Sequence, residues 1–350
     1  MKKDNMIKPK KLKKNDTVAI VSLSSGMGGE PNFLHRYEMG KKRLETEFGL
    51  NVVTMPNALK GIEYLDKYPE ARANDLMEAF QDKTIKAIIC MTGGDDTIRL
   101  LRHIDINVIK ENPKIFMGYS DTTANHFMMY KAGVVSFYGP SIMAEFAENV
   151  AMHEYTKRHI KNTLFKPSSE LLIKPSPIWT SEFIDWADES NNKIARTMTN
   201  DIKNYELLQG DGIIQGRLLG GCIDVFPMIM GSKIWPNNRG WEKSILFLET
   251  SEECPQPTDV KRILRNLAAQ KVFDRISGIV FGKPYHEKYY KEYRQVLVQV
   301  VGKESKRPNL PILYNVNFGH TEPKCILPYG VLAEINCENK SFRLLEAGVI

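Results

Sequence analysis

The sequence lacks the features of a disulfide-rich protein, of a metal-binding protein and of a membrane-spanning protein. The 350 residues include only five cysteines, an odd number, with no C-x-x-C pair and no other spacing typical of a metal site. The seven histidines form no H-E-x-x-H motif and no H-x-H pair, so we expect no structural zinc site. No apolar run reaches the roughly 20 residues that a membrane helix needs. We therefore expect a soluble protein of a reducing, cytoplasmic compartment.

The chain has no excess of positive charge outside one short segment. The formal net charge is +6, and residues 1–14 account for all of it, with seven lysines and one aspartate. A nucleic-acid-binding protein usually carries a basic stripe over its folded surface instead. The pattern predicts a solvated polar terminus and no nucleic-acid or membrane partner.

Short apolar strands alternate with helical segments in the first half of the chain. We expect strands at 17–23, 51–55, 85–91 and 115–118, and helices at 33–48, 69–80, 96–103 and 122–132. This alternation predicts an α/β domain over residues 1–165, with a parallel sheet covered on both faces.

The composition changes near residue 165. Residues 166–205 are polar and contain several prolines, which predicts a linker and an active-site loop. Beyond them, residues 206–350 form a predicted strand-rich domain with one helix near 258–270. Its strands are expected at 212–219, 244–249, 276–281, 313–317 and 330–336.

Ser120 stands at a predicted strand-to-helix corner in the segment KIFMGYSDTTANHFMMYKA. Gly118 permits a sharp turn before it, and Asp121 is a typical residue for the start of the next helix. A nucleophile elbow has this arrangement, with an exposed hydroxyl beside backbone N–H donors. Thr122 replaces the second glycine of G-x-S-x-G, so a serine that only caps the helix is the alternative.

A second turn, CMTGGDDT, follows the strand expected at 85–91. In a parallel sheet it lies at the same carboxyl edge as Ser120, where ligands bind. The backbone N–H of Gly93 or Gly94 is therefore a candidate oxyanion donor. A plain tight turn is the alternative.

A nucleophilic serine needs a base, and the base needs a carboxylate that orients it. Glu249 follows the apolar run 245–248, where a carboxylate without a partner would be costly to bury. His320 lies in a loop after a predicted strand and a glycine, whereas most of the other histidines lie in helical patterns. These two residues are the candidates for the carboxylate and the base.

Taken together, these segments resemble the LD-carboxypeptidase family of serine peptidases. Five short motifs occur in the family's order, and they are Gly93-Gly94, Gly118–Asp121, Leu248-Glu249, Gly319–Thr321 and Leu327-Pro328. The segment 214–223 also resembles the family's glycine-rich segment. The resemblance extends over nearly the whole chain. It implies a flavodoxin-like N-terminal domain that carries Ser120, a β-barrel-like C-terminal domain that carries Glu249 and His320, and a homodimer.

The resemblance also implies the chemistry. Ser120, Glu249 and His320 would form a catalytic triad without a cofactor. N–H groups of Asp121 and of Gly93 or Gly94 would hold the oxyanion.

Within the family, the chain resembles the microcin C self-immunity (MccF-like) branch, because of a long insertion at 175–192. In that branch an aromatic residue stacks on a nucleobase; Trp186 is the first candidate and Trp179 the second, and either could instead anchor the loop. Cys222 stands where relatives commonly have asparagine, so it is a candidate substrate contact that leaves substrate choice open.

Three functions follow as hypotheses. The first is hydrolysis of a peptidyl-nucleotide or similar carboxyl-terminally modified substrate. The second is removal of the terminal D-alanine from a murein tetrapeptide. The third belongs to another class: Gly93–Thr97 resembles the G-G-D-G-T phosphate turn of some kinases, with Asp96 in place of a glycine, and a non-catalytic nucleotide-conjugate binder is also conceivable.

Overall fold

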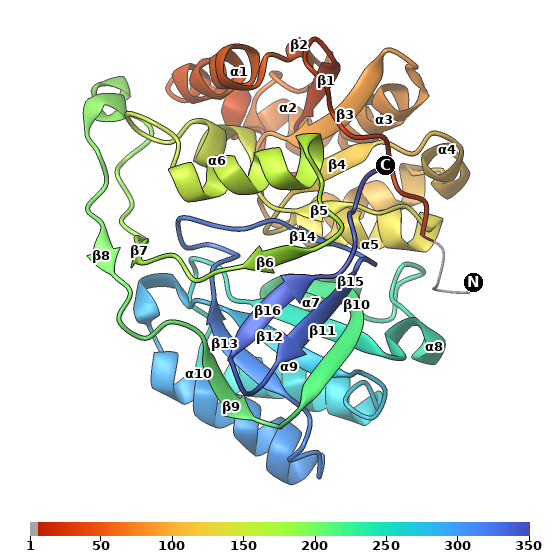
Figure 1. Ribbon diagram of the computed structural model, residues 1–350. Helices are drawn as coiled ribbons and strands as arrows, with labels where there is room; N and C mark the ends of the chain where they lie inside the picture. Colours follow the sequence, from red (N-terminus) through yellow and green to blue (C-terminus); the bar gives the residue numbers. More distant parts are fainter. Residues whose placement is uncertain (1–5) are drawn as a thin grey trace. The chain divides into compact units, whose positions relative to one another are not determined.

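The computed structural model describes residues 6–350, which divide into two compact units (Figure 1). The first unit contains the chain up to Pro167 together with Glu182–Thr197 and Gly348–Ile350. The second unit contains Ser168–Ser181 and Met198–Ala347. The segment 166–205, expected as linker and loop, is therefore shared between the two units.

The first unit is built on a parallel sheet. Its strands lie in the order β2-β1-β3-β4-β5, and each neighbouring pair is parallel. This is the flavodoxin-like order, so the predicted fold of the N-terminal domain is confirmed. The strands are β1 (Thr17–Val21), β2 (Asn51–Thr54), β3 (Ile85–Cys90), β4 (Ile115–Gly118) and β5 (Phe137–Tyr138).

Helices connect these strands close to the predicted positions. They are α1 (Leu34–Phe48), α2 (Ile62–Lys67), α3 (Pro69–Gln81), α4 (Ile106–Glu111), α5 (Thr122–Ala132) and α6 (Glu154–Ile160). α1 ends where Gly49 adopts a left-handed conformation with φ 68°, which glycine tolerates best. The segment expected as a helix at 96–103 is a 3-10 helix, Thr97–His103.

The second unit contains an eight-stranded mixed sheet, in the order β6-β16-β15-β10-β11-β12-β13-β9. The strands β10 to β13 are parallel, and antiparallel pairs flank them. The predicted strand-rich second half is thus confirmed. The strands are β6 (Leu171–Ile173), β9 (Glu206–Gln209), β10 (Ile213–Cys222), β11 (Ser244–Glu249), β12 (Gly278–Gly282), β13 (Ile312–Val316), β15 (Leu332–Asn336) and β16 (Ser341–Leu344).

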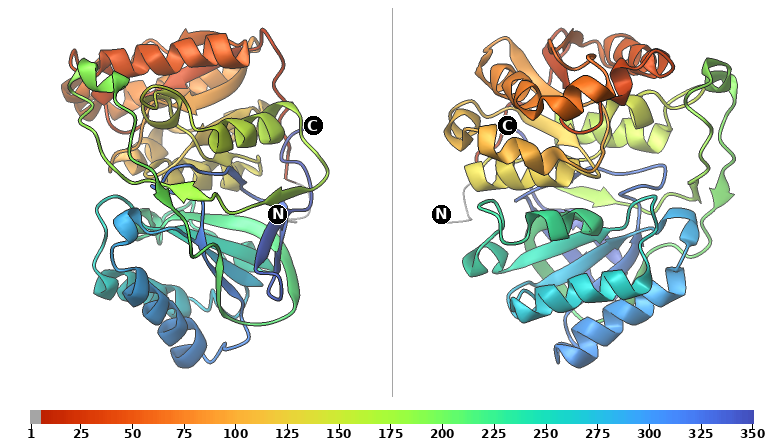
Figure 2. Two further views of the ribbon diagram at one scale, coloured as in Figure 1. Left: turned by 60° about the vertical axis from the view of Figure 1, so that its left-hand side comes forward. Right: turned by 180° about the vertical axis from the view of Figure 1, so that it is seen from behind.

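Two longer helices, α9 (Pro257–Ala269) and α10 (Tyr290–Leu297), run side by side in the second unit (Figure 2). The prediction of a single helix in this half was wrong. α10 buries Tyr290, Tyr293 and Val296 at helical spacing, but the charged residues between them hide this pattern in the sequence.

The described part of the amino-terminal segment lies along the first unit. The N–H of Ile7 donates to the carbonyl of Gly133, and that of Leu12 donates to the carbonyl of Leu164. Lys10, Lys11, Lys13 and Lys14 are exposed, as expected of a solvated terminus. Residues 1–5 of that predicted terminus lie outside the described residues. Within residues 6–350 no helix is both long and apolar enough to cross a bilayer.

Candidate active site

Ser120 occupies a strained corner of the first unit. It lies between β4 and α5 and has a φ of 63°, a conformation that stores roughly 1–3 kcal/mol in a residue other than glycine. Its backbone N–H donates to the hydroxyl of Tyr138 at 3.2 Å. A serine on a strained strand-to-helix turn is the geometry of a nucleophile elbow.

Gly93 packs directly against Ser120. A Cβ at position 93 would lie 2.8 Å from the Cβ of Ser120, 3.0 Å from its Oγ and 3.6 Å from the backbone nitrogen of Asp121. Only glycine allows this close approach. The turn after β3 therefore borders the serine hydroxyl and the N–H of Asp121, the residue that caps the following helix.

The side chain of Asp121 ties three loops together. It is fully buried, and one carboxylate oxygen accepts hydrogen bonds from Ser24 Oγ at 2.6 Å and from the N–H of Thr97 at 2.8 Å. Burial raises the pKa of this carboxyl, and the two hydrogen bonds oppose that shift. These hydrogen bonds thus hold the loops that follow β1, β3 and β4 together next to Ser120.

A buried arginine braces the same loops. Arg72 donates to both carboxylate oxygens of Asp96, at 2.6 and 2.9 Å, and to the carbonyl of Ser24 at 3.0 Å. Burial disfavours the charge on Asp96, but the hydrogen bonds from Arg72 outweigh it and lower its pKa. An ionised acid in this turn would repel a phosphate group, which argues against the kinase-like hypothesis.

His126 supports the elbow from the interior. Its Nε2 lies 2.9 Å from the carbonyl of Gly118, and its Nδ1 lies 2.8 Å from Ser136 Oγ. Burial lowers the pKa of His126 to about 3. This histidine is therefore neutral and structural.

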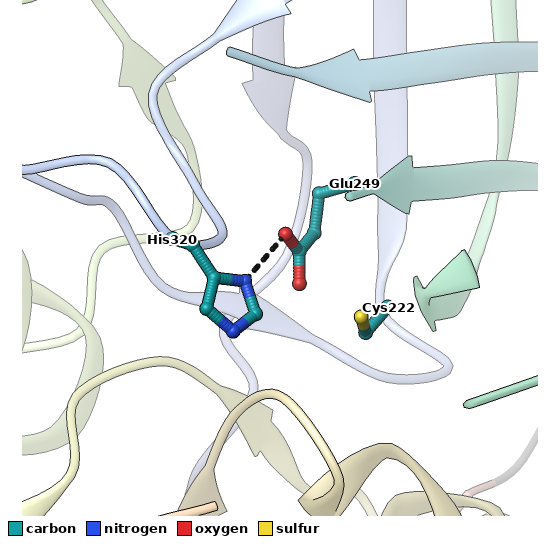
Figure 3. A group of neighbouring side chains, drawn as sticks. All are labelled: Cys222, Glu249 and His320. Atoms are coloured by element: carbon teal, nitrogen blue, oxygen red, sulfur yellow. Dashed lines mark hydrogen bonds and ion pairs between the residues drawn. The ribbon is translucent and has the colours of Figure 1, made fainter. Parts of the chain in front are cut away.

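The second unit brings Glu249 and His320 into contact (Figure 3). Glu249 is the last residue of β11 and is fully buried, and its Oε2 lies 2.8 Å from Nδ1 of His320. A Cβ at Gly319, where φ is 95°, would lie 2.6 Å from that oxygen. A Cβ at Gly282 would lie 2.8 Å from the Cβ of Glu249. The two glycines therefore make room for the pair.

A second carboxylate lies against the other ring nitrogen. Glu252 Oε2 is 3.0 Å from Nε2 of His320, and its side chain is 55% exposed. Burial lowers the pKa of His320, but Glu249 and Glu252 outweigh this effect and raise it to about 10. The imidazole in this arrangement is protonated near neutral pH.

Cys222 completes this group. It ends β10, pairs in register with Glu249, and is 1% exposed. Its Sγ lies 3.5 Å from Oδ2 of Asp224. Burial, reinforced by Glu249 and Asp224, raises the pKa of the thiol well above its ordinary value, so the sulfur carries a proton at neutral pH.

Trp186 is anchored to the start of α1. The guanidinium of Arg36 lies 4.7 Å from the centre of its ring, and its carbonyl accepts a hydrogen bond from His35 Nε2 at 3.0 Å. Asn192 approaches the other nitrogen of His35 at 2.7 Å. The contacts of Trp186 with Arg36 and His35 therefore hold its loop against the first unit, which is the anchoring role given above as the alternative to stacking.

Trp179 belongs to the second unit, where it is 9% exposed and the ammonium of Lys283 lies 4.7 Å from the centre of its ring.

The candidate residues thus form two groups. Ser120, Gly93 and Asp121 come together in the first unit, where Gly94 packs instead against Ser24. Cys222, Glu249 and His320 come together in the second unit. The roles of Arg72, Tyr138 and Glu252 near the site were not predicted from the sequence. Arg72 and Tyr138 contact residues distant in sequence, and Glu252 lies in a short run of acidic and polar residues typical of a solvent-exposed loop.

Models of the LD-carboxypeptidase family match both halves of the chain. The model of the family's N-terminal domain matches residues 18–139, and that of its C-terminal domain matches residues 215–335. The Microcin C7 self-immunity protein MccF of Escherichia coli is 32% identical over 283 residues, which cover 79% of this chain and 78% of the relative.

Solved structures agree with these matches. An MccF-like protein from Streptococcus pneumoniae, in complex with AMP, is 35% identical, has a TM-score of 0.86, and covers 94% of this chain and 98% of its own. MccF in complex with glutamyl sulfamoyl guanosine is 27% identical, with a TM-score of 0.84 and coverage of 98% and 99%. With both family domains matched and an identity above 30% over most of its length, the chain belongs to the LD-carboxypeptidase family of serine peptidases and has MccF and MccF-like proteins among its relatives.

Proposed function

We propose that this chain cleaves an amide-type bond in an aminoacyl or peptidyl nucleotide, with Ser120, Glu249 and His320 as its catalytic triad. Two observations support the proposal: a serine on a strained turn bordered by glycine, and a buried carboxylate paired with a histidine. We call these two groups the half-sites. Acyl transfer by a serine hydrolase requires such a nucleophile and such an oriented base. Both occur on a chain of a serine peptidase family.

The proposed mechanism assigns one role to each residue. Ser120 Oγ attacks the substrate carbonyl and passes its proton to Nε2 of His320, while Glu249 holds Nδ1 and stabilises the imidazolium. N–H groups of Asp121 and of Gly93 or Gly94 hold the oxyanion. The nitrogen leaving group departs with the proton, and water then hydrolyses the acyl-enzyme. Because Nε2 faces Glu252 in this structure, Glu252 has to move before His320 can act as a base.

The nucleotide part of the proposal is supported by relatives. Their structures hold AMP, glutamyl sulfamoyl guanosine and aspartyl sulfamoyl adenosine. In this chain Trp186 is a half-buried aromatic on a long loop, and we assign it the role of stacking on the base. A cytoplasmic location, expected from the cysteine usage, and a homodimer, implied by the family, belong to the same proposal.

The second candidate is a murein peptide carboxypeptidase. A Bacillus subtilis relative bears the name "Probable murein peptide carboxypeptidase" and is 28% identical over 98% of this chain. The same half-sites would serve that reaction, so the substrate has to separate the two candidates.

The test compares two substrates with wild type and Ser120→Ala. Aspartyl sulfamoyl adenosine and a murein tetrapeptide ending in D-alanine are incubated with each protein, and the products are separated by chromatography. We expect cleavage of the adenosine compound, its loss in Ser120→Ala, and little cleavage of the tetrapeptide. Cleavage of the tetrapeptide alone would support the second candidate.

Binding separates a catalyst from a binder. If neither compound is cleaved but both proteins bind AMP equally, the hydrolase proposal is wrong and the nucleotide-conjugate binder is favoured. Trp186→Phe keeps an aromatic ring, whereas Trp186→Ala removes it. A loss of AMP affinity confined to Trp186→Ala would support base stacking.

A further inference from the structure

Three side chains with different metal-binding atoms converge in the second unit. The Sγ of Cys222, a carboxylate oxygen of Glu249 and a ring nitrogen of His320 all lie within 4.8 Å of one another (Figure 3). They come from the end of β10, the end of β11 and the loop after β13. Because residues 222, 249 and 320 are far apart in sequence, no metal-type spacing was visible there.

The donor set is selective. A thiolate with an imidazole and a carboxylate suits Zn²⁺ and similar borderline-soft ions better than Mg²⁺ or Ca²⁺, which prefer oxygen ligands. Three protein ligands also leave one tetrahedral position for water. We propose that Cys222, Glu249 and His320 form a zinc-binding site.

The surroundings of His320 fit this role. With Nδ1 on the metal, Nε2–H would donate to Glu252, whose Oε2 already lies 3.0 Å away. A carboxylate on the outer nitrogen of a metal-bound histidine is a common supporting contact, because it orients the ring and makes it a stronger ligand. Glu252 therefore supplies the outer contact that such a site needs.

The local charge also favours a cation. Glu249 and Glu252 both contact His320, and Asp224 lies 3.5 Å from Cys222 Sγ. This group places two carboxylates on the imidazole and a third beside the thiol. A divalent ion would replace the proton shared by Nδ1 and Oε2 and the proton of the thiol, so its two positive charges would take the place of those two protons.

Zinc binding would have a functional consequence. The ion would occupy Nδ1 of His320 and the carboxylate of Glu249, and it would remove the hydrogen bond between them. A protein with zinc bound would therefore lack the oriented base on which the proposed hydrolysis depends. The inference of zinc binding itself stands apart from that activity, because it rests on the second unit alone.

The test uses Co²⁺ as a spectroscopic probe on the full-length, metal-free protein. We expect a thiolate-to-cobalt charge-transfer band that appears on titration and disappears when Zn²⁺ is added. Cys222→Ser should abolish the band and weaken zinc binding by more than the roughly tenfold to hundredfold that loss of an outer contact costs. Glu252→Gln should keep the band and weaken binding by about tenfold. Cys337→Ser, which changes another buried cysteine of the same unit, should leave both unchanged.

Two outcomes would overturn the inference: the absence of a charge-transfer band in the wild type, or a band that persists in Cys222→Ser. The first outcome is measured on the wild type, so the inference can be refuted even if a variant fails to fold. Circular dichroism of each variant checks its fold. An active protein without the band would count against zinc binding alone, and a protein with the band but without hydrolysis would count against the proposed function alone.

Discussion

Glu249 and Gly319 are in contact closely enough that no side chain fits between them. A Cβ at position 319 would lie 2.6 Å from Oε2 of Glu249, the oxygen that contacts His320. The position of the carboxylate thus depends on the absence of a neighbouring side chain as much as on its hydrogen bond. This relationship leads to the first prediction.

Gly319→Ala should displace Glu249 and abolish hydrolysis. Gly319 has a φ of 95°, so alanine adds backbone strain as well as a collision. The expected loss of unfolding free energy is about 2–4 kcal/mol. Gly212→Ala is the matched control, because φ is 73° there and nothing lies within 4 Å of an added Cβ. It should cost roughly 1–2 kcal/mol from the backbone conformation alone and keep activity. Equal losses in urea denaturation would show that the collision does not matter.

Ser120→Gly should be inactive and yet at least as stable as wild type. Glycine removes the strain of a φ of 63°, worth roughly 1–2 kcal/mol, and this exceeds its entropic penalty of roughly 0.5–1 kcal/mol. Ser120→Ala should be equally inactive but should keep the strain. A Ser120→Gly protein less stable than Ser120→Ala in denaturant unfolding would contradict the assignment of strain to this corner.

The pH dependence should reveal Glu252 as a competitor for the base. Because Glu252 helps to raise the pKa of His320 to about 10, Glu252→Gln should lower the apparent pKa of kcat/KM and increase activity several-fold near neutral pH. Glu253→Gln, a neighbouring exposed glutamate, serves as the control and should leave the profile unchanged. An apparent pKa that does not move in Glu252→Gln would refute the competition.

Stability should also depend on His320. Its folded-state pKa of about 10 lies above the ordinary value near 6.5, so its stabilising contribution is complete below about pH 6.5 and is lost as the pH rises through about 10. Unfolding free energies of wild type and His320→Gln should therefore converge as the pH rises. A constant difference would mean that His320 stabilises through packing and not through charge.

Arg72 should matter far more than its neighbour Arg99, although both contact Asp96. Arg72 is 1% exposed, whereas Arg99 is 41% exposed. Arg72→Leu leaves the carbonyl of Ser24 without its donor and leaves Asp96 with Arg99 alone, which should cost roughly 1–3 kcal/mol and reduce activity. Arg99→Leu should cost at most about 1 kcal/mol. Thermal unfolding of the two variants tests the difference, and similar losses would show that Arg72 does not brace the loops.

The sequence alone determined the elements whose patterns are local. Thr122–Ala132 and Ser244–Glu249 have the bounds that were predicted, because the period of their apolar residues and their flanking turns depend only on near neighbours. The parallel pairing of the first sheet followed from the alternation of strands and helices, whereas its flavodoxin-like order was implied by the family resemblance. α10 was missed, because the charged residues between its buried ones obscured the period.

Only the tertiary structure decided which side chains meet. The pairing of Glu249 with His320, the contact of Glu252 with the same ring, and the nearness of Cys222 join segments separated by up to about a hundred residues. Arg72 became a brace because α3 brings it to Asp96. No local pattern encodes such contacts: they depend on how strand ends converge at the edge of a sheet, which the packing of the whole unit sets.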